Sequence, residues 1–174
     1  MSSPITSTTG GADQAIYVYG TLDYDWWSRE LGEEIAPGSF GENLSIGGLE
    51  STGFAIGDRL LIGDELVLEV SAPRIPCAVL AARMRSAQFV RRFRDAERPG
   101  LYCWVIAEGG AERGDAVKVA AYAGERVTAL EVFRDTYAPS DDEAVLRRFL
   151  SAPLAERARN DKLAQLERLL TPVR

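Results

Sequence analysis

Short runs of β-branched, aromatic or alternating apolar residues recur up to about residue 133 and predict a β-rich domain. Each run is bounded by glycine, proline, aspartate or serine, which is typical of short strands joined by tight turns. The predicted strands are Ala15–Tyr19, Leu44–Ile46, Phe54–Ile56, Arg59–Ile62, Glu65–Ser71, Leu101–Ile106, Ala116–Tyr122 and Val127–Phe133. Many short strands at this spacing favour a barrel or closed sheet over a doubly wound fold, so we expect a mainly β protein.

Helices are predicted between these strands. The first would begin at Thr21, whose hydroxyl can cap it, and end at Gly32, which tolerates the left-handed conformation of a helix terminus. Its adjacent tryptophans, Trp26 and Trp27, must point to different sides of the helix. One is therefore expected in the core and the other at a pocket or an interface. Two shorter helices are predicted at about 78–84 and 86–95.

The pattern changes at Ser140, where a helical appendage is predicted. Ser140 and Glu143 have the spacing of a capping box, and a second helix is expected to start at Asn160 and to stop before Pro172. Leucines recur on one side of both segments, as in amphipathic helices. The predicted organisation is a flexible N-terminus at 1–11, a β-barrel domain at 12–136 and a small helical C-terminal domain at 140–172.

Composition and charge narrow the classes of function. The 174 residues, 46% of them apolar, suit one domain with a real core, and the net charge of -6 argues against nucleic acid as the main partner. No apolar run is long enough to span a membrane, and the polar start of the sequence lacks the features of a signal peptide. Two cysteines make no disulfide framework, so we expect a cytoplasmic protein with reduced thiols.

The sequence contains no histidine, and this excludes several kinds of catalytic site. Ser-His-Asp and Cys-His triads are impossible, and so are zinc sites with histidine ligands. Lysine is also rare, since Lys118 and Lys162 are the only two against eighteen arginines. Schiff-base chemistry therefore has almost no candidates, and pyridoxal phosphate is not expected as a cofactor.

The loop Pro73–Cys77 carries the strongest chemical signal. Its two prolines stiffen the backbone, and Cys77 lies beside Arg74 and just before a predicted helix. A guanidinium and a helix N-terminus both lower the pKa of a thiol, and the thiolate is a nucleophile or a soft metal ligand. Two simpler readings stay open. The cysteine can be a small buried residue, and Arg74 can pair with a carboxylate such as Glu69 or Asp58.

At this point several motifs together resemble the MOSC domain, named after the C-terminal domain of molybdenum cofactor sulfurases. They cover roughly residues 9–170 in the order found in that family, and the likeness is greatest to its stand-alone, YiiM-like group with a helical C-terminal tail. The matching segments are Gly10–Tyr17, Pro37–Leu44, Ile56–Arg59, Leu68–Cys77, Arg98–Tyr102, Gly114–Asp115 and Val127–Thr128.

The resemblance implies a β-barrel-like fold that holds the molybdenum cofactor and reduces N-hydroxylated small molecules, with electrons from separate redox proteins. Cys77 would then ligate molybdenum or carry sulfur as a persulfide, and Glu42 would join it as a catalytic residue. The cofactor-binding residues would be Gly10, Gly11, Asn43, Arg74 and Tyr102. The chemistry is consistent, because molybdenum accepts a thiolate and a pterin phosphate suits arginine and backbone N–H donors.

The sequence departs from this family in three places. Family members have a longer segment before the Gly-Gly motif, often with histidine where this chain has Thr9, and many have lysine where it has Val79. A barrel without its first strands exposes edges. Either a homodimer closes these edges or the pocket is left open. Two alternatives therefore remain. The scaffold is a cofactor-free derivative that binds or transforms a small molecule in the same pocket, or it is a persulfide sulfur carrier on Cys77.

The other candidate residues have two readings each. Glu42 and Asn43 either shape the cofactor pocket or only satisfy backbone groups in a glycine-rich turn, and Glu42 can act as a general acid or base if its pocket raises its pKa. Cys103 is expected to pack in a strand. The arginines between 91 and 98 form either a solvated helix face or a site for an anion or an acidic redox partner.

Overall fold

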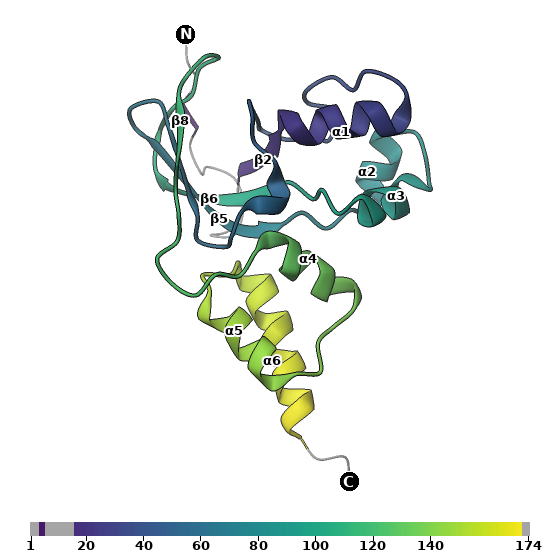
Figure 1. The fold of residues 1–174 in the computed structure, drawn as a ribbon, viewed down its shortest axis with the longest axis vertical. Coiled ribbons are helices and arrows are strands. Elements are labelled where there is room, and N and C mark those ends of the chain that lie inside the picture. The colour runs from purple at the N-terminus through teal and green to yellow at the C-terminus, as the bar shows by residue number, and fades with distance from the viewer. Residues whose placement is uncertain (1–3, 6–15, 172–174) are drawn as a thin grey trace.

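A curled six-stranded sheet forms one part of the molecule, with three helices to its right and a helical tail below it in the view of Figure 1. The structure is a computed structural model that describes residues 4–5 and 16–171. The strands of this sheet lie in the spatial order β3-β2-β6-β5-β4-β8. They are β2 (Ile16–Gly20), β3 (Leu44–Ile46), β4 (Arg59–Ile62), β5 (Leu66–Pro73), β6 (Leu101–Ala107) and β8 (Val117–Ala120).

The sheet is an open half-barrel. β2 pairs with β3 in parallel, and the other neighbouring pairs are antiparallel. β3 and β8 are its two edges among the residues that the structure describes, which confirms a barrel-type fold that is incomplete around its circumference. A separate ladder joins β1 (Pro4–Ile5) to β7 (Gly109–Gly110). The strand predicted at Phe54–Ile56 is reduced to an isolated bridge between Ala55 and Thr128.

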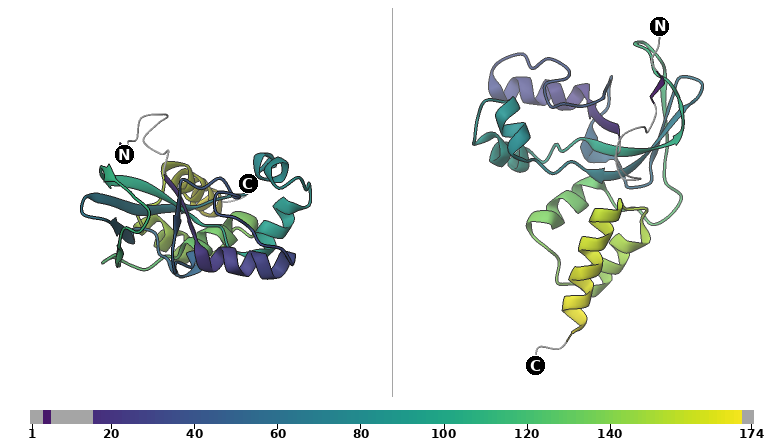
Figure 2. Two further views of the ribbon diagram at one scale, coloured as in Figure 1. Left: turned by 90° about the horizontal axis from the view of Figure 1, so that it is seen from above. Right: turned by 180° about the vertical axis from the view of Figure 1, so that it is seen from behind.

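Helices lie at two places around the sheet. α1, α2 and α3 gather beyond one end of it, whereas α4 lies next to the sheet and α5 and α6 form the tail (Figures 1 and 2). None of the helices in the described part of the chain is long and apolar enough to cross a membrane. The helices are α1 (Thr21–Leu31), the 3-10 turn η1 (Ser51–Gly53), α2 (Ala78–Arg83), α3 (Phe89–Ala96), α4 (Ala129–Tyr137), α5 (Glu143–Ser151) and α6 (Glu156–Leu170).

The strand predicted at Val127–Phe133 is wrong, because this segment opens helix α4. Thr128 is the N-cap, and its side chain forms a reciprocal capping box with Glu131. Buried side chains then recur at helical spacing, as at Ala129 and Val132. The β-branched and aromatic composition of the segment favours a strand, but the cap and the packing of the helix against β5 outweigh it.

α1 begins where it was expected, but a glycine rather than Thr21 precedes it as the cap. Gly20 is the N-cap, and a Cβ there would lie 1.9 Å from the carbonyl oxygen of Leu49, so no larger residue fits. The Thr21 hydroxyl instead accepts the backbone N–H of Gly48. The end of the helix is as predicted, since Gly32 adopts a left-handed φ of 73°.

The caps predicted for the C-terminal helices are also wrong, although both helices exist. Asp142 caps α5, and its carboxylate accepts two backbone N–H groups of the first turn. The hydroxyl of Ser140 accepts the N–H of Asp142 instead of capping the helix. α6 begins at Glu156, so Asn160 lies inside it. Several polar residues precede each helix, and the sequence does not say which of them adopts the cap geometry.

Buried apolar side chains form two clusters, one aliphatic and one aromatic. β2 contributes to both, because successive side chains of a strand point to opposite faces. Val18 belongs to the aliphatic cluster, whereas Tyr17 and Tyr19 belong to the aromatic cluster. The aliphatic cluster includes Val18, Leu60, Leu68, Val70, Leu101, Val132, Leu146, Phe149 and Leu166. The buried members of the aromatic cluster are Tyr17, Tyr19, Tyr24, Trp27, Phe40, Leu80, Phe89 and Phe93.

A buried ion pair joins α6, the last helix of the tail, to α4, the helix that packs against the sheet. Lys162 of α6 donates to Asp135 of α4, and the two side chains are 3% and 4% exposed. The Lys162 ammonium also lies 5.5 Å from the centre of the Phe149 ring. A charge buried this deeply is unfavourable without its partner, so the pair fixes α6 against α4. It also commits one of the two lysines to a structural contact.

Candidate functional site

Tyr17 is the residue around which several of the predicted site residues meet. It is buried in β2, and its backbone N–H and C=O are both bonded to Asn43, each over 2.8 Å. The Arg74 guanidinium lies 4.7 Å from the centre of the Tyr17 ring, and the Tyr102 ring lies 5.1 Å from it. The Tyr17 hydroxyl donates to the carbonyl oxygen of Pro99 over 2.9 Å. Asn43, Arg74 and Tyr102 are therefore brought together by a residue that was not singled out.

Electrostatics around Tyr17 follow from its burial. Burial raises the pKa of the Tyr17 hydroxyl well above its ordinary value, and the nearby Arg74 opposes this shift. The ring therefore stays neutral and presents its face to the Arg74 cation. The only sequence signal for Tyr17 was its position at the end of the Gly10–Tyr17 motif. Gly10 and Gly11 themselves, like Thr9, lie outside the described residues.

Arg74 joins two loops instead of forming an ion pair. The simpler expectation paired it with Glu69 or Asp58, but Glu69 bonds Arg59 over 2.7 Å and Asp58 lies 3.7 Å from Arg126. Arg74 donates to the carbonyl oxygen of Phe40. The glycine-rich segment 37–42 is thereby held against the loop that leads to Cys77.

A second arginine repeats this connection from helix α2. Arg83 donates to the carbonyl oxygens of Ser39 and Gly38, over 3.0 and 2.8 Å. Cys77 is the N-cap of the same helix, and its carbonyl accepts the N–H groups of Leu80 and Ala81. The cysteine therefore stands on a frame that two arginines fasten to the 37–42 segment.

Cys77 is exposed at the start of α2, whereas the second cysteine is inaccessible. Cys103 is fully buried in β6, and burial raises the pKa of its thiol. Val79, which stands where many members of the resembled family have lysine, is 70% exposed. Of the two thiols, Cys77 is therefore the one that a ligand or a reagent can reach.

Glu42 collects three hydrogen bonds on one carboxylate oxygen. Its Oε1 accepts the hydroxyl of Tyr24 at 2.5 Å, the N–H of Gly38 at 2.6 Å and the hydroxyl of Ser45 at 2.7 Å. Its Oε2 is buried and has no partner among the described residues. A buried acceptor without a donor is unfavourable and rare. Burial and the bond to Glu42 also raise the pKa of Tyr24.

The aromatic cluster holds the residues next to Tyr17 in place through hydrogen bonds and close packing. The Trp27 indole N–H donates to the Tyr19 hydroxyl over 2.8 Å, and that hydroxyl donates to the carbonyl oxygen of Arg98 over 2.9 Å. Trp27 is the fully buried tryptophan that was expected in the core. Trp26 is half-buried, and the Arg98 guanidinium lies 5.1 Å from its ring. A Cβ on Gly100, whose φ is 68°, would lie within 3 Å of the rings of Tyr17 and Tyr19, which is why a glycine stands here.

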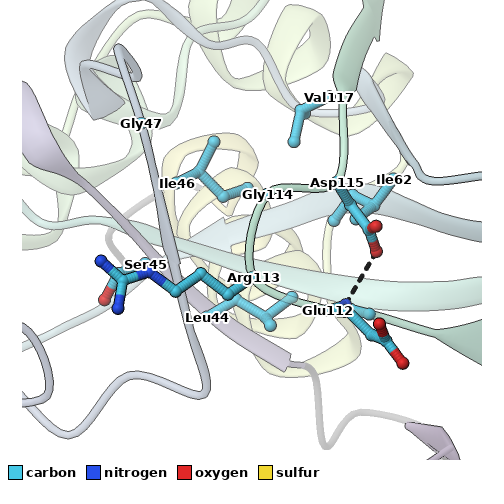
Figure 3. A pocket seen from close by; sticks show the side chains of 11 residues that line it. Leu44, Ser45, Ile46, Gly47, Ile62, Glu112, Arg113, Gly114, Asp115 and Val117 are labelled. Carbon is cyan, nitrogen blue, oxygen red and sulfur yellow. Dashed lines mark hydrogen bonds between the residues drawn. The ribbon is translucent and has the colours of Figure 1, made fainter. Parts of the chain in front are cut away.

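A cavity of about 540 Å³ lies between the two edges of the half-barrel (Figure 3). Its walls are apolar side chains of β3, β4 and β8, and the turn between β7 and β8 supplies polar groups, among which Arg113 extends towards Ser45 (Figure 3). Ser45 belongs to this wall, and its hydroxyl donates to Glu42, which does not itself line the cavity. Cys77, Arg74 and Tyr102 do not line it. The lining residues are Leu44, Ser45, Ile46, Gly47, Ile62, Ala111, Glu112, Arg113, Gly114, Asp115 and Val117.

No group of three or more histidine, cysteine, aspartate or glutamate side chains is placed to hold a metal ion in the part of the chain that the structure describes. Lys118 lies on the edge strand β8 and is exposed. With Lys162 committed to Asp135, the described lysines form no nucleophile within the site. The charged groups placed around Tyr17 are therefore Arg74 and Glu42, and the exposed thiol of Cys77 lies on the loop that Arg74 begins.

Comparison with known proteins shows which family the sequence matches and which proteins it resembles. The model of the MOSC domain family matches residues 6–118. The uncharacterized protein YflK of Bacillus subtilis is 30% identical over 162 residues, which span 92% of this chain and 73% of that protein. YiiM of Escherichia coli is 35% identical over 104 residues, and a protein of Gibberella moniliformis named reductase is 31% identical over 117 residues. These two matches span 46% and 21% of the respective relatives.

Solved structures have the same fold. The crystal structure of YiiM from Geobacillus stearothermophilus superposes with a TM-score of 0.84 at 25% identity, covering 95% of this chain and 86% of that chain. YiiM from Escherichia coli superposes with a TM-score of 0.81 at 25% identity, covering 97% and 87%. The half-barrel, the helices beyond its end and the helical tail are thus shared with these proteins.

Proposed function

Since the chain belongs to the MOSC domain family, we propose that it holds a molybdenum cofactor on Cys77 and reduces an N-hydroxylated small molecule. One observation carries the proposal. The exposed Cys77 stands on a frame that Arg74 and Arg83 fasten to the segment bearing Glu42. A relative named as a reductase supports the reaction class, although the match spans only 21% of that protein.

The residues present fit this cofactor. The described residues offer no cluster that would hold a bare metal ion, but a metal already bound by the sulfur atoms of its organic carrier needs only one thiolate from the protein. Arg74 uses one donor on the carbonyl of Phe40 and keeps others for an anionic phosphate. The Oε2 of Glu42 has no partner among the described residues, so it is the carboxylate oxygen that could carry the proton which the reduction consumes.

The residues would divide the work as follows. Reduction of an N-hydroxylated compound to the amine and water consumes two electrons and two protons. When bound, the cofactor would supply the metal centre through which the electrons pass. Cys77 would hold that metal as a thiolate, and Glu42 would deliver a proton to the leaving hydroxyl group. Tyr24 and Ser45 keep the Glu42 carboxylate oriented through their bonds to Oε1.

Metal analysis tests the proposal directly. Protein made in a host that synthesises the cofactor is expected to contain about one molybdenum per chain. Cys77→Ser should lose the metal, because the hydroxyl is a poor soft ligand, whereas the matched variant Cys103→Ala should keep it. Equal molybdenum in Cys77→Ser and wild type would contradict the ligand role. No molybdenum in folded wild-type protein would contradict the proposal as a whole.

The cavity supports a second candidate function, a cofactor-free scaffold that binds a small molecule. It adjoins Glu42 through Ser45 and excludes Cys77, so a ligand there needs no metal. In metal-free protein, screening small amphipathic heterocycles by thermal shift should find ligands that stabilise wild type but not Ile46→Trp, which fills the cavity. Ligands that stabilise both proteins equally would contradict this use of the cavity.

The persulfide reading makes a separate chemical prediction. A sulfur carrier would release thiocyanate when treated with cyanide, and Cys77→Ser would abolish the release while Cys103→Ala would not. Exposure of Cys77 is compatible with this role. Thiocyanate release that is absent from wild-type protein, or unchanged in Cys77→Ser, would exclude it.

A further inference from the structure

The cavity between the two edges of the half-barrel combines aliphatic walls with one polar turn. Its volume of about 540 Å³ lies within the range of about 300–1,000 Å³ that is usual for pockets of small molecules. Leu44, Ile46, Ile62 and Val117 supply the aliphatic walls. Transfer of apolar surface from water to such walls is favourable, so the cavity selects a ligand with an apolar body.

Arg113 is the only cation that lines this cavity among the described residues. It is exposed, and no hydrogen bond or ion pair joins its guanidinium to another residue in the described part of the chain. Figure 3 shows its side chain extended towards Ser45 of β3. A guanidinium offers five N–H donors in a planar fork that matches a carboxylate, so this side chain is available to an anionic group of a ligand.

The turn that carries Arg113 is held in one shape by its own hydrogen bonds. The N–H of Asp115 donates to the carbonyl oxygen of Glu112 over 3.2 Å, and the N–H of Glu112 donates to the Asp115 carboxylate over 2.7 Å. Gly114 has a φ of 102°, which glycine adopts without the strain that a Cβ would bring. An arginine on a fixed turn loses less freedom on binding than one on a mobile loop.

The two carboxylates of the turn restrict the charge of the ligand. Glu112 and Asp115 form no ion pair with Arg113, and both carboxylates lie apart from its guanidinium in Figure 3. Two carboxylates and one arginine give the lining a net charge of -1. This charge repels a dianion such as a phosphate more strongly than a monoanion. The geometry therefore favours one carboxylate, placed beside Arg113 on the β3 side.

We propose that the cavity binds an apolar monocarboxylate of medium chain length. Its carboxylate pairs with Arg113, and its tail packs against Ile46, Ile62 and Val117. This rests on the second candidate function, because it names the class of ligand for that cavity. Cys77 does not line the cavity, so binding requires neither its thiolate nor a metal.

The test compares three probes that share a tail and differ in the head group. Octanoate, 1-octanol and octylamine are titrated into the full chain at pH 7, and binding is measured by calorimetry. Octanoate is expected to bind at least about tenfold more tightly than the other two, because only its head group accepts charged hydrogen bonds from a guanidinium. Hexanoate should bind about fifteenfold more weakly than octanoate, since each buried methylene contributes about a factor of four.

Two variants of the turn test the head group. Arg113→Gln should weaken octanoate binding about tenfold and leave octanol binding unchanged. Glu112→Gln is the matched control, since it removes a charge of opposite sign from the same turn. It should leave the octanoate affinity equal or raise it by up to about twofold.

Variants of the walls test the position of the tail. Ile46→Trp fills the cavity and should abolish octanoate binding. Val117→Trp lies on the edge strand β8, and it replaces Ile46→Trp if circular dichroism shows that the latter is not folded. Octanoate binding that persists in a folded cavity-filling variant would place the ligand elsewhere and overturn the proposal.

The other contradicting results are absence of octanoate binding, octanol or octylamine binding as tight as that of octanoate, and equal weakening by Arg113→Gln and Glu112→Gln. These failures are separable from that of the proposed function. If octanoate does not bind but heterocycles stabilise wild type and not Ile46→Trp, only the carboxylate is contradicted. If neither class of ligand binds, the second candidate function fails with it. Molybdenum content is measured separately on the same preparation.

Discussion

The aliphatic and the aromatic cluster differ in what holds their side chains in place. In the aliphatic cluster, valines, leucines and isoleucines of the sheet pack against α4, α5 and α6 without directional bonds. In the aromatic cluster, Tyr17, Tyr19, Tyr24 and Trp27 each donate a hydrogen bond to a defined acceptor. Apolar burial stabilises a fold but tolerates repacking, whereas hydrogen bonds with fixed geometry also orient the groups they join. The predicted site residues lie on the oriented side.

The groups that accept these hydrogen bonds show which segments the aromatic cluster positions. Tyr17 and Tyr19 donate to the carbonyls of Pro99 and Arg98, which precede β6, and Tyr24 donates to Glu42. Rings in contact at 4.8 to 6.4 Å add about 0.5–1.5 kcal/mol each beyond their buried area. The cluster thus fixes the loops that carry the site relative to the sheet. Substitutions on the two sides should therefore differ in kind as well as in size.

The largest loss of stability is expected from Lys162→Met, which leaves Asp135 buried without its partner. Breaking a buried ion pair costs about 3–5 kcal/mol of unfolding free energy, measurable by urea denaturation. Lys162→Met combined with Asp135→Asn should recover most of this, because asparagine keeps the acceptor for the N–H of Ser140. A double variant as unstable as the single one would show that packing, and not the uncompensated charge, sets the cost.

Leu68→Ala is expected to cost about 2–5 kcal/mol, since it empties a fully buried position of the aliphatic cluster. The substitution removes apolar contacts but no hydrogen bond. The near-ultraviolet circular dichroism of the aromatic cluster should therefore stay unchanged in the folded variant. An altered aromatic spectrum in Leu68→Ala would show that the two clusters are coupled and would remove the basis of the comparison.

Tyr19→Phe is expected to cost about 1–3 kcal/mol with almost no change in volume, because it strands the buried N–H of Trp27 and the carbonyl of Arg98. Trp27 fluorescence and the near-ultraviolet spectrum should both change. Tyr137→Phe is the matched control, since Tyr137 is 39% exposed and lies outside the aromatic cluster. Equal stability loss in both variants would contradict the role given to the hydroxyl.

The smallest effect is expected from Glu131→Gln, about 0.5–1 kcal/mol at neutral pH. Burial raises the pKa of Glu131, but hydrogen bonds from Arg148 and Thr128 outweigh it, so its pKa lies below the ordinary value of 4.5. The unfolded state therefore binds the proton first, and the stabilisation is complete above pH 4.5 and is lost as pH falls through the folded pKa.

Glutamine keeps an acceptor oxygen for the capping box and removes the charged oxygen that accepts the hydrogen bond of Arg148. The stability difference between wild type and Glu131→Gln should therefore be full at pH 7 and shrink towards zero in acid, as measured by thermal unfolding across that range. A difference that stays constant with pH would contradict the ionic contribution of the bond between Glu131 and Arg148.

Sequence patterns located the strands well where alternation coincides with one-sided burial. In β4, which was predicted as a strand at the same residues, Leu60 and Ile62 are buried while Arg59 and Leu61 are exposed. They failed at the opening of α4, where a short apolar run fits a strand or a helix equally well. Thr128 and Glu131 carried the deciding capping box, and only the packing of α4 against β5 shows that it is used.

The structure connects the segments that carry the predicted site residues through contacts that the sequence did not predict. The motifs drew attention to Glu42, Asn43, Arg74 and Cys77, which the structure places on connected segments. Partner choice was beyond the sequence, because Arg74 could have reached several carboxylates and instead bonds a carbonyl and covers Tyr17. The cavity was equally invisible, since its walls come from opposite edges of the sheet.

By itself the sequence determined the element types of the half-barrel, the acidic balance, the absence of histidine chemistry and the family motifs. These depend on local spacing and on residue type, which a linear chain displays directly. Only the tertiary structure decided that Arg74, Asn43 and Tyr102 meet at Tyr17, and that Glu42 keeps a buried oxygen without a partner among the described residues. Those properties depend on which distant segments meet and on which side chains water still reaches.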